Sequence, residues 1–132
     1  MSMPADKQLN TTALAFLGDA VYEVRVRERV IKSGQTNADV LHGMAVQYVN
    51  AKAQAKTLKM IRNELSEDER DLVRRARNRK PGTKPKNVGF VEYKQATAFE
   101  ALIGHLYLAR DEERLNEILN LAFEANLNGD GK

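Results

Sequence analysis

The chain contains no cysteine, and this absence excludes several kinds of chemistry at once. Without thiols, neither disulfides, nor zinc–thiolate sites, nor a cysteine nucleophile can contribute. No apolar run approaches the roughly 18 residues of a membrane-spanning helix. The N-terminal stretch MSMPADKQLN lacks the charged-then-apolar layout of a signal peptide. We therefore expect a cytoplasmic, soluble protein with no membrane partner.

The sequence also lacks the patterns of a β protein. It shows no strand-like alternation of useful length, no internal repeat and no glycine-rich phosphate loop after a strand. A chain of 132 residues has room for one domain with a real core. We predict an all-α domain over residues 8–127, with flexible termini at 1–7 and 128–132.

Capping residues and helical periodicity predict where these helices begin and end. Asn10 to Thr12, Asn37 or Asp39, and Asn50 are N-cap candidates, and Ser66 with Glu69 forms a capping box. Gly34 is a plausible left-handed stop. The helices expected from these signals span about 12–33, 38–49, 51–65, 67–79, 95–110 and 112–127. The last of them has a core stripe of Leu115, Ile118, Leu119, Ala122 and Phe123.

Positive charge is concentrated in one part of the chain. The net charge is +3, but residues 74–94 hold eight Lys or Arg against one acid, Glu92. Within this region, residues 80–93 carry two of the three prolines and are expected to form a long irregular loop. Such a basic segment suits phosphate contact, and the alternative is a solvated linker. Lys52, Lys56 and Lys59 form a further stripe, either merely solvated or an extension of a phosphate-contact surface.

The segment LAFLGDAVYEV, residues 14–24, places an acid and a glycine within an apolar helix. Its helical spacing predicts one apolar face, made of Leu14, Leu17, Val21 and Val24. Gly18 indicates a place where another backbone or a ligand comes close. Asp19 beside it is a carboxylate expected to be at least partly withdrawn from water, and such a group needs a cation, a set of donors or a shifted pKa.

A second segment, ATAFEALIGHLYLA at residues 96–109, repeats this pattern with Glu100 and Gly104. One interpretation is that each acid lies at a solvated helix edge and the glycines serve packing. The other is that the two helices pack together and share a divalent metal. Glu23, one turn after Asp19, could support that metal or simply pair with Arg27.

These motifs resemble a known family. Leu-Ala-Phe-Leu-Gly-Asp-Ala at 14–20 is similar to the signature of the ribonuclease III endonuclease domain, and residues 99–108 are similar to its second acidic motif. The run from Arg74 to Lys80 and the segment 85–87 resemble the Mini-ribonuclease III group in particular. The resemblance covers roughly residues 8–125.

The resemblance implies an endonuclease that cuts double-stranded RNA with Mg²⁺, leaving 5′-phosphate and 3′-hydroxyl ends. It implies that Asp19 and Glu100 are both the catalytic residues and the metal ligands. It also implies a homodimer, with Phe16 at the dimer contact. Precursor 23S ribosomal RNA is the implied substrate, with a large-subunit ribosomal protein as a possible partner. The residues expected to contact RNA are Arg74, Arg75, Arg77, Asn78, Arg79, Lys80, Lys84 and Lys86.

Two positions depart from the pattern of the larger ribonuclease III enzymes. Those enzymes carry acids where this chain has Ala15 and Thr97. The site therefore keeps two acids of four, which leaves more of the metal's ligands to water. Two other functions compete with the enzyme: a catalytically inactive RNA-binding module or ribosome assembly factor of the same fold, and a structural helical dimer that binds an acidic protein.

Overall fold

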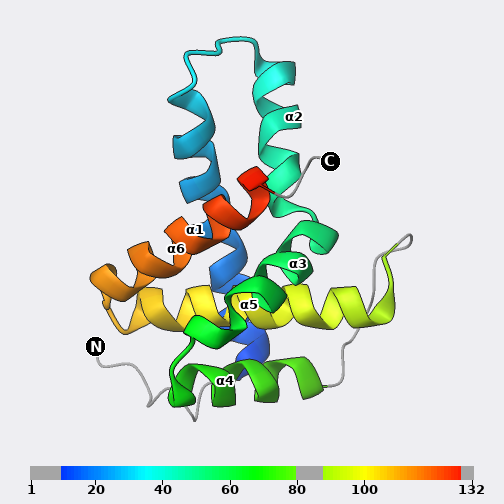
Figure 1. Cartoon of the computed structure of the whole chain (residues 1–132), viewed down its shortest axis with the longest axis vertical. Helices are drawn as coiled ribbons and strands as arrows, with labels where there is room; N and C mark the ends of the chain where they lie inside the picture. Colours follow the sequence, from blue (N-terminus) through cyan, green and yellow to red (C-terminus); the bar gives the residue numbers. More distant parts are fainter. Residues whose placement is uncertain (1–9, 80–87, 129–132) are drawn as a thin grey trace.

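The fold is seen in a computed structural model of the chain, which describes residues 10–79 and 88–128 (Figure 1). Within these ranges the chain forms helices and no strand, so the predicted all-α fold is confirmed. The elements are α1 (Thr11–Ile31), α2 (Ala38–Val49), α3 (Ala51–Ile61), the 3-10 turn η2 (Arg62–Glu64), α4 (Glu67–Asn78), α5 (Phe90–Leu108) and α6 (Glu112–Asn128). None of the described helices is long and apolar enough to span a membrane.

The predicted caps begin the helices as expected. The side chain of Asn10 accepts a hydrogen bond from the Thr12 N–H, and Asn37 and Asn50 cap α2 and α3 in the same way. Both hydrogen bonds of the Ser66–Glu69 capping box are present at the start of α4. Gly34 has a φ of 88°, in the left-handed region that favours glycine.

Three predicted boundaries or faces were wrong. α5 begins at Phe90 rather than near residue 95, because its N-cap, Gly89, has no side chain to signal the start. α3 ends at Ile61, and η2 takes up the following residues. Val24 is 55% exposed, since it projects about 200° around α1 from the buried Tyr22.

The molecule is organised around the crossing of α1 and α5, which make the most extensive contact between any two helices (Figure 1). α3 and α4 also pack against α5, and α2 runs back along the far half of α1. Tyr22 meets the Phe99 ring edge-on, with 5.0 Å between centroids, and stacks on Phe123 at 6.4 Å. These three rings join α1, α5 and α6 in one core, which includes the whole predicted stripe of α6.

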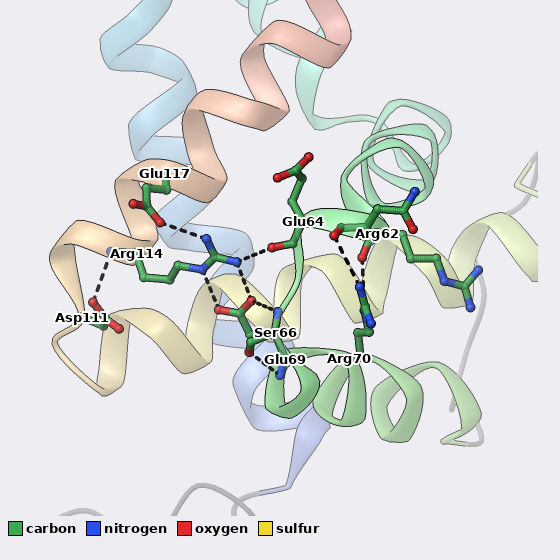
Figure 2. A network of polar contacts seen from close by, with 9 residues as sticks. Arg62, Glu64, Ser66, Glu69, Arg70, Asp111, Arg114 and Glu117 are labelled. Carbon is green, nitrogen blue, oxygen red and sulfur yellow. Dashed lines mark hydrogen bonds and ion pairs between the residues drawn. The ribbon is translucent and has the colours of Figure 1, made fainter.

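A polar network centred on Arg114 fixes the start of α4 against α6 (Figure 2). The Arg114 guanidinium donates to both carboxylate oxygens of Glu69, with N–O distances of 2.7 and 2.8 Å. It also donates to the Glu64 carbonyl at 2.7 Å and to Glu117 at 2.9 Å. Glu69 is only 7% exposed, but its charge is fully matched. The guanidinium and the capping box hold the pKa of Glu69 below its usual value.

Candidate active site

Gly18 of α1 and Gly104 of α5 lie where the two helices cross. A Cβ added to Gly18 would overlap the carbonyl oxygen of Glu100, and one added to Gly104 would overlap the carbonyl oxygen of Leu14. The two backbones are therefore in direct contact, which only glycine permits here. This confirms the close approach predicted for Gly18. It also brings together the two acids that neighbour the crossing, Asp19 and Glu100.

The two carboxyl groups differ in their surroundings. Glu100 is partly buried, whereas Asp19 is exposed. The withdrawal from water that was expected of Asp19 is therefore found at Glu100 instead. Burial raises the pKa of Glu100 to about 8, and the negative charge of Asp19 contributes to this rise, as does a hydrogen bond between the two side chains. Burial beside a second acid thus favours the protonated form of the Glu100 carboxyl group.

No described Lys or Arg forms an ion pair with either acid. The nearest polar partner is Gln54 of α3, whose amide hydrogen-bonds Glu100 and partly offsets the rise in its pKa. Gln54 is 2% exposed, and its Nε2 donates to the Val49 carbonyl at 2.8 Å. Its Oε1 is buried without a partner among the described residues.

Gln54 was missed by the sequence analysis. The signal was present, because Gln54, Leu58 and Ile61 have the i, i+4, i+7 spacing of one buried helix face. A glutamine on such a face must find hydrogen bonds inside the protein. Only the packing of α3 on α5 shows that one of its partners is Glu100.

The two positions that depart from the family pattern add no charge to the site. Ala15 is buried, and Thr97 turns its hydroxyl to the Tyr93 carbonyl of its own helix at 2.9 Å. Glu23 accepts a hydrogen bond from Arg27 Nε at 2.8 Å, so it pairs with a base as one of the two interpretations expected. Accordingly, the described residues contain no group of three or more acids, histidines or cysteines that could hold a metal.

The predicted RNA-contact residues fall into two groups. Arg74 and Arg75 both pair with Asp71, on the same turn of α4. Arg77, Asn78 and Arg79 follow at the end of α4, where the structure gives them no carboxylate partner among the described residues. Lys80, Lys84 and Lys86 lie outside the described residues, as do the predicted flexible termini apart from Asn128.

Comparison with known proteins gives the class of this fold and site. Residues 12–111 match the family model of the Ribonuclease III domain. A solved structure from Fusobacterium nucleatum matches with a TM-score of 0.82 and 35% identity, over 92% of this chain and 98% of that one. The fold is therefore that of a ribonuclease III domain.

The more specific relatives carry the name Mini-ribonuclease 3. The protein of that name from Thermoanaerobacter sp. (strain X514) is 47% identical over 116 residues, which cover 88% of this chain and 82% of the relative. The one from Symbiobacterium thermophilum is 49% identical over 109 residues, covering 83% and 84%. The chain belongs to the ribonuclease III family, in its Mini-ribonuclease 3 group, and it is an endoribonuclease.

Proposed function

We propose that this protein cleaves double-stranded RNA with Mg²⁺ as its cofactor, held by Asp19 and Glu100. The observation that carries the proposal is the pair of acids itself. Withdrawing a carboxylate from water costs several kcal/mol unless it is compensated, and no basic side chain compensates Glu100 within the described residues. The raised pKa of Glu100 reflects this lack of compensation, and a divalent cation between the two carboxyl groups would supply it.

The donor atoms at the site suit a hard cation. Asp19 and Glu100 offer carboxylate oxygens, and Gln54 adds an amide oxygen that has no other partner in the described part of the chain. Mg²⁺ prefers such oxygen ligands and retains water, which a site with few protein ligands requires. Neither His nor Cys is needed.

When bound, Mg²⁺ would activate a water, stabilise the charge that develops on the phosphate and neutralise the leaving oxygen. The protein's own part is to hold its acids in place. The contact between the α1 and α5 backbones fixes the two acids relative to each other, and Gln54 holds Glu100 from a third helix. Asp19, being exposed, keeps the site open to a large substrate. The expected products end in 5′-phosphate and 3′-hydroxyl groups.

Proteins of the ribonuclease III family act on double-stranded RNA, and this chain has a basic surface suited to it. Arg77, Asn78 and Arg79 end α4 just before the basic residues Lys80, Lys84 and Lys86. In A-form RNA the base edges of the major groove are out of reach of side chains, so such residues contact phosphates and 2′-hydroxyls. We infer that recognition depends mainly on the shape of the duplex.

The family typically acts as a dimer, and we propose a homodimer with Phe16 in the contact. Phe16 is 83% exposed on α1, an unusual position for a large aromatic side chain. Phe16→Asp should convert the dimer to a monomer in sedimentation experiments, because it would place a charge in a self-complementary contact. Val40→Asp, which alters an exposed apolar residue of α2, is the control. A Phe16→Asp dimer of unchanged affinity would contradict the assignment.

Membership of the group supports maturation of precursor 23S ribosomal RNA as the cellular role, in the cytoplasm, with a large-subunit ribosomal protein presenting the RNA. This part of the proposal rests on the similarity of the chain to the Mini-ribonuclease 3 proteins. It is tested by whether the purified protein cuts precursor 23S RNA at a defined position, with and without ribosomal proteins of the large subunit.

The central test is incubation with long double-stranded RNA in Mg²⁺ or in excess chelator. Fragments that carry 5′-phosphates and appear only with Mg²⁺ are expected. Asp19→Asn is the matched control for a contaminating nuclease. Binding without cleavage would instead indicate an inactive RNA-binding module, and absence of RNA binding would indicate the structural dimer.

A further inference from the structure

A groove is lined by residues of α3, η2, α4 and the N-terminal half of α5. Its volume is about 870 Å³. Leu58, Leu65 and Val73 give it an apolar floor, and basic side chains line much of the rest. An apolar floor suits long basic side chains, because their stems can lie on it while their charged ends reach water.

Most of the positive charge in this groove is not neutralised. Three acids also line it, Glu67, Asp71 and Glu92, but Asp71 already pairs with Arg74 and Arg75. Six lining cations have no carboxylate partner in the described part of the chain: Lys52, Lys56, Lys59, Arg62, Arg70 and Arg77. A concave surface lined by uncompensated charge of one sign focuses its field and attracts a polyanion.

The geometry of α3 separates this groove from the acids. Lys56 lies two residues after Gln54, about 200° around the helix, and Lys52 and Lys59 lie close to the direction of Lys56. Gln54 faces Glu100, so the three lysines lie on the opposite face of α3. Neither Gln54 nor either acid is among the residues that line the groove, so a ligand in the groove does not occupy the carboxylate site.

We propose that this groove is a second binding surface for RNA phosphates, distinct from the catalytic acids. The inference rests on the proposed function, since the ligand is another stretch of the same RNA. Two features favour RNA over an acidic peptide. Lys52, Lys56 and Lys59 follow one line along about 10 Å of helix, which suits the regular row of charges on a phosphate backbone. Arg77 also joins the groove to the basic end of α4, which is already assigned to RNA.

The test is the salt dependence of binding to a long RNA duplex, in chelator so that no cleavage occurs. The triple variant Lys52→Gln/Lys56→Gln/Lys59→Gln removes three charges while keeping polar side chains of similar helix propensity, and these lysines are not buried, so we expect the fold to be retained. The log–log salt slope should become flatter by roughly 2 to 3, borrowing 0.7–0.9 for each phosphate neutralised from other nucleic acids. The affinity should fall about equally for duplexes of unrelated sequence.

Lys32→Gln, an exposed lysine at the end of α1, is the matched control and should leave the slope unchanged. The proposal would be overturned if Lys32→Gln lowered the RNA affinity and flattened the salt slope as much as each groove substitution does. Net charge alone would then explain both effects. An unchanged slope in the triple variant would also overturn it. The proposal would likewise be overturned if the triple variant kept its RNA affinity but lost binding to poly-glutamate, because the groove would then bind an acidic peptide. If wild-type protein binds RNA and cuts it with Mg²⁺ in any of these cases, the proposed function stands and only the groove assignment falls.

Discussion

Two glutamates of this protein are withdrawn from water, and their surroundings shift their pKa values in opposite directions. Glu69 is matched by a two-pronged contact with Arg114 and by the capping box, which keep it ionised (Figure 2). Glu100 has no cation partner in the described chain, and its burial and the neighbouring Asp19 raise its pKa. The matched carboxylate contributes to the fold, whereas the unmatched one is suited to bind a cation. Under the proposed function, local compensation rather than burial separates the structural acid from the functional one.

The largest expected effect is on catalysis. Asp19→Asn and Glu100→Gln should each lower the rate of single-turnover RNA cleavage by about a thousandfold or more, and the double variant should lose little further, because the two groups act on one ion. Neither substitution should reduce the stability of the metal-free protein, since each replaces a carboxyl group of the acid pair with a neutral amide. Retained cleavage by either variant would remove that residue from the site.

The same variants test shared metal binding without relying on activity. Mg²⁺ should raise the melting temperature of the wild-type protein, because it binds only the native state. This increase should shrink in each single variant and shrink little more in the double variant, with a coupling energy of about 0.5–3 kcal/mol. Glu69→Gln should keep the full response to Mg²⁺.

The crossing of α1 and α5 should not tolerate a side chain at Gly18 or Gly104. Gly104→Ala places a Cβ against the carbonyl of Leu14, and a backbone cannot yield as a side chain can. We expect a loss of about 3 kcal/mol in the free energy of unfolding, at the upper end of overpacking effects, together with loss of cleavage. Gly43→Ala is the control, because nothing lies near its added Cβ, and it should be neutral or stabilising by up to about 1 kcal/mol. Equal stability of the two variants in urea unfolding would contradict the crossing.

Substitution of Glu69 should lower stability and leave cleavage unchanged, the reverse of what is expected for Asp19 and Glu100. Glu69→Gln should cost about 2 kcal/mol in urea unfolding, less than a fully buried pair because Arg114 remains partly exposed. RNA cleavage per folded molecule should be kept. Glu117→Gln, which alters the exposed partner of Arg114, should cost under about 1 kcal/mol.

The two acids should also give opposite pH dependences in metal-free protein. The folded-state pKa of Glu100, about 8, lies above the unfolded value of about 4.3, so the folded state holds the extra proton between these values. Glu100 therefore lowers stability as the pH rises from about 4.3 to 8, by at most about 1.4 kcal/mol per pH unit. Glu100→Gln should remove that fall. Glu69, with a lowered pKa, contributes stability that is lost as the pH falls through its folded-state value. Identical pH profiles of wild type and Glu100→Gln would contradict the shift.

The smallest effects should separate RNA binding from chemistry. Charge reversal at Arg77, Arg79, Lys84 and Lys86 should weaken binding to unrelated duplexes about equally and flatten the salt slope by roughly 0.7–0.9 for each phosphate that is no longer neutralised. Arg75→Gln should have less effect than Arg79→Gln, because Arg75 is already paired with Asp71. A change confined to one RNA sequence would show that these residues read bases.

Much of this structure could be predicted from local signals in the sequence. Asn10, Asn50 and the Ser66–Glu69 box began helices as expected, because capping depends on neighbouring residues alone. The start of α5 was misplaced, since Gly89 gives no such signal. Of the site, the close approach at Gly18 was predicted, but the contact between Gln54 and Glu100 was not. That contact depends on how α3 packs against α5, which no local pattern specifies.

The crossing of α1 and α5 has a consequence for how the protein is made. Asp19 belongs to α1, and Glu100 belongs to α5, which is synthesised later. Until α5 has left the ribosome and docked on α1, the growing chain holds only a single carboxylate where the pair will form. A nuclease synthesised on a machine made of RNA therefore acquires the acid pair proposed as its metal site only after α5 has been made.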